Sequence, residues 1–84
     1  MLKKELLKIF TRNFKLNKNK ILKLKNNKID LKFNEYEQWD SLKHASILTD
    51  LEKKFKIQLN TSTIIHLNSF TSILNFLKQK VKRK

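Results

Sequence analysis

The chain has 84 residues and a formal net charge of +13, from 20 lysine and arginine side chains against 7 aspartates and glutamates. A chain of this length forms one small core, which excludes a deeply enclosed active site and predicts a single domain over residues 1–84. Cysteine, glycine and proline are absent, which excludes disulfides and thiolate metal sites and leaves turns to asparagine, aspartate, serine and threonine.

The positive charge is concentrated at the two ends of the chain. Residues 1–34 carry 11 basic and 2 acidic side chains, and residues 78–84 carry 5 basic and none acidic. Residues 35–77 have 4 lysines against 5 acids and are nearly neutral. We expect residues 78–84 to be a flexible, solvated tail. No apolar run is long enough for a transmembrane segment or a signal peptide core, so we expect a soluble, cytoplasmic protein.

The first predicted element is an amphipathic helix over Leu2–Phe14. Apolar residues recur there at three- and four-residue steps, and basic residues occupy the other side. We expect its apolar face to pack on the helix that follows Ser41. The alternative is a helix that lies on an anionic membrane surface.

Residues 15–38 lack a clear period and predict a long connection between helices. Their apolar residues are scattered among lysines and asparagines, and the alternation over residues 28–33 leaves a short strand as an alternative.

The next predicted helix, Ser41–Phe55, starts at a candidate functional residue. Its expected inward stripe consists of Leu42, Ala45, Ile47, Leu48, Leu51 and Phe55. Either Asp40 or Ser41 can cap the helix through a side-chain oxygen. The Ser41 hydroxyl would then lie at the positive end of the helix dipole, where a phosphate meets unpaired N–H groups. Ser41 is therefore a candidate to carry a phosphodiester.

Two further helices are predicted after it. Thr61 or Ser62 can cap a short helix over residues 61–67, and Ser69 can cap a last helix over residues 70–81.

Residues 33–77 resemble the acyl carrier protein family. The resemblance is carried by Asp40-Ser41-Leu42, by the run Leu-Glu-x-x-Phe-x-Ile-x-Leu from Leu51 to Leu59, and by the apolar residues of the two last segments, Ile64, Ile65, Leu67 and Phe70. It implies an all-α, four-helix bundle whose long first loop tucks apolar residues over the core, with residues 19–25 as a candidate turn of helix.

The resemblance also implies a function. A phosphopantetheinyl transferase would attach 4′-phosphopantetheine to Ser41, between the motif residues Asp40 and Leu42. Other enzymes would load and remove an acyl or aminoacyl group held on the arm as a thioester. The protein itself would be a monomeric, stand-alone carrier and no enzyme. The candidate partner contacts near the serine are Trp39, Lys43, His44 and Ile47, and Trp39 has the alternative role of a core residue.

The sequence departs from the family in charge and in one loop residue. Many members have a glycine where this chain has Gln38. Typical members present carboxylates on the helix after the serine, whereas this helix has Asp50 and Glu52 among the lysines 43, 53, 54 and 56. We therefore expect dedicated partners rather than the usual fatty acid synthase enzymes, in a lipid-, polysaccharide- or secondary-metabolite-modifying pathway.

Two other classes of function compete with the carrier. Asp40, Ser41 and His44 are the residue types of a hydrolase, but all three would lie on one helix start, and no glycine-rich oxyanion loop exists. The high charge also fits a small basic helical nucleic-acid-binding protein, although the first turns of the Ser41 helix lack the set of basic residues that a recognition helix needs. His44 and His66 are the only histidines and form no metal motif.

Overall fold

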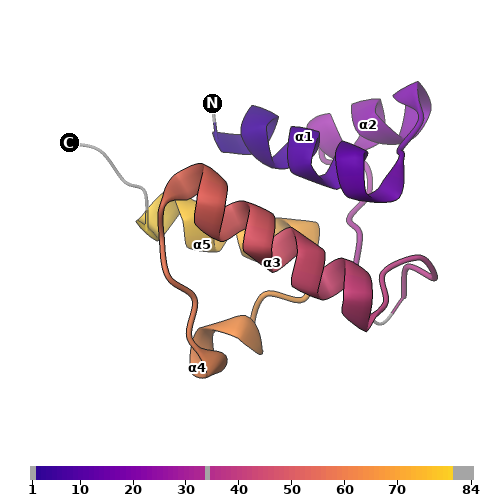
Figure 1. Ribbon diagram of the computed structural model, residues 1–84. Coiled ribbons are helices and arrows are strands. Elements are labelled where there is room, and N and C mark those ends of the chain that lie inside the picture. The colour runs from indigo at the N-terminus through magenta and orange to yellow at the C-terminus, as the bar shows by residue number, and fades with distance from the viewer. Residues whose placement is uncertain (1, 34, 81–84) are drawn as a thin grey trace.

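The described part of the chain is helical throughout its regular structure. The computed structural model describes residues 2–33 and 35–80. They form α1 (Leu2–Phe14), α2 (Lys18–Lys25), α3 (Ser41–Phe55), α4 (Thr61–Ile64) and α5 (Phe70–Lys80) (Figure 1). Since these residues contain no strand, the predicted all-α class is confirmed. None of their helices has the length and apolar character needed to cross a bilayer.

The bounds of the helices agree with the sequence in most places. Both α1 and α3 have the predicted limits, and the expected turn at residues 19–25 is the two-turn helix α2. The helix expected over residues 61–67 ends at Ile64. The last helix, expected over residues 70–81, is α5 and runs to Lys80, so residues 78–80 are helical and do not form the expected flexible tail. Residues 81–84 lie outside the described part.

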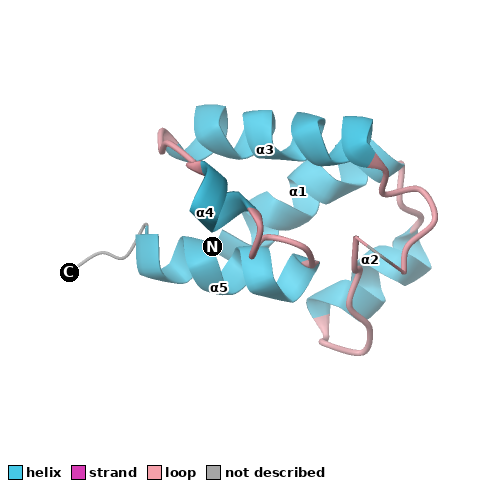
Figure 2. Ribbon diagram, turned by 90° about the horizontal axis from the view of Figure 1, so that it is seen from below, coloured by secondary structure: helices cyan, strands magenta, loops and turns pink. Residues whose placement is uncertain are grey.

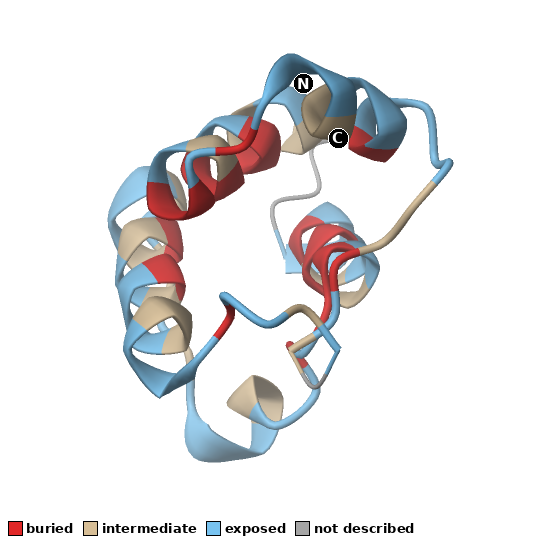
Figure 3. Cartoon of the chain, turned by 90° about the vertical axis from the view of Figure 1, so that its right-hand side faces the viewer, coloured by how far each residue is buried: buried red, intermediate tan, exposed pale blue. Residues whose placement is uncertain are grey.

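Helix α1 is the element on which the others assemble. It packs against α2, α3 and α5, and Figure 1 shows α1 and α2 above the other helices. Seen from below, α4 lies between α3 and α5 (Figure 2). The buried positions of the long helices face the middle of the molecule (Figure 3). The apolar face of α1 is therefore part of the core, as predicted, and is not exposed for membrane contact.

An aromatic cluster around Trp39 forms the centre of this core. The indole is 2% exposed, and its ring centroid lies 5.3 Å from Phe10 and 5.7 Å from Phe14. Phe10 also meets Phe70 edge to face at 5.0 Å. Edge-to-face pairs of this kind add about 1 kcal/mol each beyond the burial of their area. One indole thus connects the segment before α3 to α1.

The segment between α2 and α3 is hydrogen-bonded to the start of α5. The Phe33 N–H donates to the Asn68 carbonyl at 2.8 Å, and the Phe70 N–H donates to the Leu31 carbonyl at 2.9 Å. The alternative of a strand over residues 28–33 reduces to one isolated bridge between Lys32 and Ser69. These two hydrogen bonds attach the segment that leads to Trp39 to the start of α5. They therefore help to hold Trp39 and the start of α3 in place.

Helix ends are formed without glycine. Asn17, Asp40 and Asn60 cap α2, α3 and α4 through side-chain oxygens. Asn60 therefore takes the role predicted for Thr61 or Ser62, whereas Ser69 accepts from the Ser72 N–H at 3.0 Å as expected. The left-handed conformation after α3 is adopted by Lys56, with φ of 55°. A residue with a Cβ pays roughly 1 kcal/mol there, which a glycine would avoid.

The inward face of α3 differs from the predicted stripe. Ile47 and Leu51 are 0% exposed, whereas Leu42 is 81% exposed and Ala45 is also exposed. Residues turn by 100° per position along a helix, so Leu42 and Leu51 point in directions about 180° apart. The three-residue steps in the sequence thus drift around α3. Leu48 and Phe55 are half-buried and pack against the core, as predicted, whereas the half-buried His44, which the predicted stripe did not include, takes an inward position beside Leu51.

Candidate functional site

The candidate site is the first turn of α3. The Asp40 carboxylate caps the helix, with its Oδ1 accepting from the Lys43 N–H at 2.9 Å. The Asp40 carbonyl accepts from the His44 N–H at 2.8 Å. These bonds occupy the third and fourth N–H groups of the helix start. The N–H groups of Ser41 and Leu42 have no intrahelical partner, as expected of a first turn.

Because Asp40 is the cap, the Ser41 hydroxyl has no structural task. Ser41 is exposed, and its Oγ makes no hydrogen bond to any described residue. The other four serines all use their hydroxyls within the fold. Ser46 donates to Asn13, Ser62 donates to Asn60, and Ser69 and Ser72 bond to one another. Ser41 thus differs from the other serines because its side chain is exposed and its hydroxyl makes no hydrogen bond with the described residues.

The neighbours of Ser41 divide into exposed and buried residues. Asp40 and Leu42, the two predicted motif flanks, are exposed, and Lys43 is half-buried. Two of the predicted partner contacts, Trp39 and Ile47, are 2% and 0% exposed. That role is therefore corrected for both, because their side chains fill the core and do not reach the surface. Leu42 is instead the large apolar side chain exposed beside the serine.

His44 is tied to the core and does not project from the surface. Its Nδ1 accepts from the Trp39 indole Nε1 at 3.0 Å, and its ring stacks on Phe33 at 4.9 Å between centroids. Partial burial lowers the pKa of His44 below its usual value. The acceptor role of Nδ1 places the proton of the neutral ring on Nε2. The contact with Phe33 could not be predicted from the sequence, since eleven positions separate the two residues.

The contacts of Asp40 and His44 differ from those of a catalytic triad. Nδ1 of His44 is occupied by Trp39, and the Asp40 carboxylate caps the backbone rather than orienting the imidazole. Among the described residues, Ser41 and His44 form no hydrogen bond with each other. The described residues also contain no group of three histidines, aspartates or glutamates placed to bind a metal.

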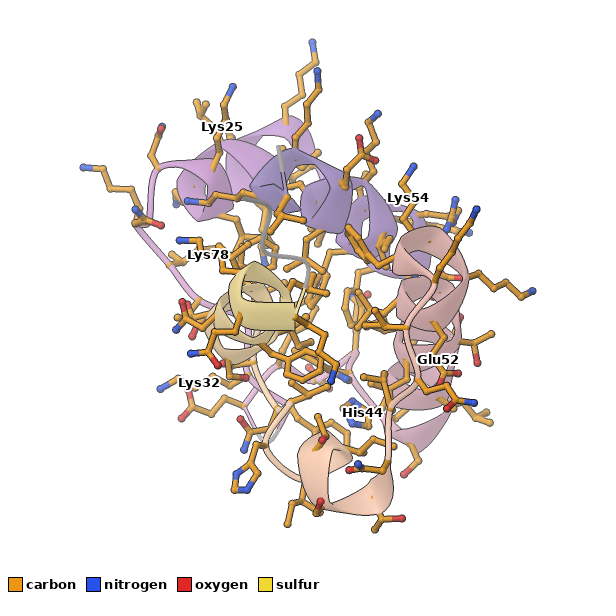
Figure 4. The ribbon with its side chains drawn as sticks, turned by 90° about the vertical axis from the view of Figure 1, so that its left-hand side faces the viewer. Lys25, Lys32, His44, Glu52, Lys54 and Lys78 are labelled. Atoms are coloured by element: carbon orange, nitrogen blue, oxygen red, sulfur yellow. The ribbon has the colours of Figure 1, made fainter. Side chains whose placement is uncertain are left out.

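The acidic residues of α3 are engaged within the molecule. Asp50 lies 3.3 Å from the Arg12 guanidinium and accepts from the Asn13 amide at 2.9 Å. Glu52 accepts from the Leu59 N–H at 3.0 Å, and Figure 4 labels it on α3 with His44 and Lys54. The sequence had placed both carboxylates among the surface charges of this helix. The exposed charges of α3 are therefore those of Lys53 and Lys54, and Lys54 is paired with Glu5 of α1 at 3.0 Å.

Comparisons of this chain with protein-family models, with curated proteins and with solved structures found no match.

Proposed function

We propose that the protein is a stand-alone carrier of the acyl carrier protein kind, with 4′-phosphopantetheine attached to Ser41. The observation that carries the proposal is the uncommitted Ser41 hydroxyl at the start of α3. A separate transferase needs an accessible hydroxyl on a rigid element, and the Asp40 cap supplies the rigidity. The resemblance of residues 33–77 to carrier domains supports the same residue.

The residues around Ser41 fit a phosphodiester. The N–H groups of Ser41 and Leu42 point out of the helix start, where the dipole favours negative charge. Lys43 adds a cation in the same turn. The protein needs no pocket to hold the group, because the attachment to Ser41 is covalent. When bound, the arm supplies the thiol that carries an acyl or aminoacyl group as a thioester.

The arrangement of the helices supports a carrier bundle. Helices α1, α3 and α5 share one core, and the short α4 lies between α3 and α5 in the chain. The segment from α2 to residue 40 takes the place of the long first loop of a carrier domain. Its residues Leu24 and Leu31 are buried in the core. In this proposal partner enzymes perform all the chemistry, and the protein supplies the arm and a stable base.

The charge of α3 supports dedicated partners. Asp50 and Glu52 are held by Arg12, Asn13 and the Leu59 N–H, so they offer little charge to a basic partner surface. Partners of this carrier would present neutral or acidic docking surfaces. This distinguishes the proposed partners from those of typical, acidic carrier proteins.

A transfer reaction followed by peptide mapping tests the proposal. The protein is incubated with coenzyme A and a broad-specificity phosphopantetheinyl transferase, and the modified peptide is located by mass spectrometry. Ser62→Ala is a matched control, since Ser62 is another exposed serine in the first turn of a helix. We expect one adduct on Ser41, lost in Ser41→Ala and retained in Ser62→Ala. An adduct on another serine, or none, contradicts the proposal.

Nucleic-acid binding is a second candidate, favoured by the charge of α1 and α2. Ten basic residues and one acidic residue lie between Leu2 and Lys28. A titration with generic duplex DNA at increasing salt separates the two candidates. Tight, salt-resistant or sequence-selective binding supports the second candidate, whereas weak binding that vanishes with salt is expected of incidental phosphate contacts.

A further inference from the structure

A hollow between α1 and α2 lies apart from the Ser41 site. Its volume is about 700 Å³, within the range of small-molecule sites. Leu7 and Ile21 form its apolar floor, one from each helix. The cationic side chains that line it are Lys3, Lys4, Lys8, Arg12 and Lys25. No carboxylate appears among the described residues of this lining.

The two helices are held at a fixed spacing at one end of the hollow. The ammonium group of Lys3, on α1, donates to the Lys25 carbonyl at 2.8 Å and to Asn27 Oδ1 at 2.7 Å. These bonds connect the start of α1 to the end of α2. The hollow is therefore part of the folded structure and does not depend on a ligand to separate the helices.

The five cationic side chains that line the hollow form its rim, and they differ in the partners that they already have. Lys8 lies 3.8 Å from Glu5, Arg12 lies 3.3 Å from Asp50, and Lys3 is bonded as described above. Lys4 and Lys25 are exposed, and their ammonium groups have no hydrogen bond or ion pair with the described residues. Among the cations that line the hollow, these two lysines are therefore the ones most available to pair with an anionic group.

We propose that this hollow binds a single-chain anionic amphiphile, such as a fatty carboxylate. Its chain lies on Leu7 and Ile21 and along the methylene stems of the lysines, and its head is paired with Lys4 and Lys25. The lining favours a ligand with both parts. An apolar chain buries the surface of Leu7 and Ile21, and a negatively charged head pairs with the lysines of the rim. The proposal does not depend on the function of Ser41.

Other anionic partners match the hollow less well. A nucleic acid would meet the lysines, but it would leave Leu7 and Ile21 uncovered, and none of the described lining residues is aromatic and could stack on a base. A bilayer surface would touch the outer ridges of α1 and α2 rather than the recess between them. The recess, its floor and its rim together favour one chain with one charged head.

The test is a titration of the isotope-labelled full chain, followed by amide NMR shifts. The probe is decanoate below its micelle concentration, with acetate as the anion without a chain and decyl maltoside as the uncharged chain. We expect saturable shifts at Leu7, Ile21 and Lys25 with decanoate alone. Equal shifts with acetate or with the maltoside overturn the proposal. Duplex DNA that shifts these amides where decanoate does not also overturns it.

Charge-reversal variants provide the second measurement. Lys4→Glu with Lys25→Glu should weaken decanoate binding roughly tenfold or more, since two attractive contacts become repulsive. The double variant Lys32→Glu with Lys53→Glu is the matched control, because it changes the net charge equally and both residues are exposed and outside the hollow; Figure 4 shows Lys32 well away from Lys25. Circular dichroism verifies that each variant is folded. Equal weakening by the control, or no weakening by the pair, contradicts the assigned rim.

Discussion

The indole Nε1 of Trp39 donates a hydrogen bond of 3.0 Å to Nδ1 of His44. Trp39 precedes the capping residue of α3, and His44 lies in its first turn, so the bond connects the loop to the helix next to Ser41. The His44 ring also stacks on Phe33. These contacts need the unprotonated form of Nδ1, because a protonated Nδ1 cannot accept the indole proton.

This pair predicts a decrease in stability in mild acid. Burial lowers the pKa of His44, so the unfolded chain takes up the proton at a higher pH than the folded chain. The free energy of unfolding should be constant above the unfolded pKa, near 6.5, and fall as the pH decreases through it towards the folded pKa. Urea denaturation at a series of pH values measures this.

The variant His44→Gln keeps an acceptor for Trp39 but cannot titrate, and it should abolish the decrease. His66→Gln, at the exposed histidine, serves as the control. If only His66→Gln removes the decrease, the assignment to His44 is wrong.

A separate decrease in the free energy of unfolding, below about pH 4.5, is expected from Glu5, whose pKa is lowered mainly by its hydrogen bond with Lys54. Stability from this group is present above that pH and is lost as Glu5 is protonated.

The division of roles between Asp40 and Ser41 predicts two different effects on stability. Asp40→Ala should lower the free energy of unfolding by about 1 kcal/mol, because it removes the cap of α3. Ser41→Ala should change it by less than about 0.5 kcal/mol, since the hydroxyl is exposed and unbonded. Urea denaturation of both variants is the measurement. A larger loss for Ser41→Ala than for Asp40→Ala would show that the serine is the cap.

A buried asparagine joins α1 to α3. The Asn13 amide donates to the Ile9 carbonyl at 2.8 Å and to Asp50 at 2.9 Å, and its Oδ1 accepts from Ser46 at 2.6 Å. Asn13→Ala should cost about 2 kcal/mol, because it leaves partly buried partners without bonds. Asn19→Ala, an exposed change on α2, is the control.

A double-mutant cycle with Ser46→Ala tests the coupling across the two helices. The two losses should be less than additive, since both variants remove the same hydrogen bond. Full additivity would mean that the Asn13–Ser46 contact contributes nothing.

The lysines of α3 predict slow modification by enzymes that act on acidic carriers. Replacing Lys43 and Lys53 by glutamate should speed arm transfer by such a transferase several-fold, because like charges no longer oppose docking. The matched control changes Lys18 and Lys23 on α2, which alters net charge equally at a different surface. Transfer rates at low and high salt are compared. Equal acceleration by the control pair would attribute the effect to net charge alone.

Much of the helical structure could be predicted from periodicity and capping residues. The limits of α1 and α3 follow from their apolar steps, and Asp40 marks the start of α3. The inward face of α3 could be assigned in this way for Ile47, Leu48, Leu51 and Phe55, but not for Leu42, Ala45 and His44. Leu42 looks apolar enough for the core, yet His44 takes the inward position because Trp39 and Phe33 supply its contacts. When a polar residue faces inward because of partners outside its own helix, the sequence of that helix does not reveal its orientation.

The candidate site was predictable in position but not in its contacts. The motif indicates Ser41, but sequence leaves open whether Asp40 or Ser41 caps the helix. It also gives no sign that Asn13 and Arg12 engage Asp50, because these residues lie far apart in the chain and meet only after α1 packs on α3. The burial of Trp39 and Ile47 likewise depends on the whole core.

Intact-mass analysis decides whether Ser41 is an attachment point. The protein and its Ser41→Ala variant are each incubated with coenzyme A and a broad-specificity phosphopantetheinyl transferase. We predict that the parent gains the mass of one phosphopantetheinyl group and that the variant gains none. A parent protein that stays unmodified while a known carrier is fully converted under the same conditions, or a variant that is still modified, would show that Ser41 is not the attachment point.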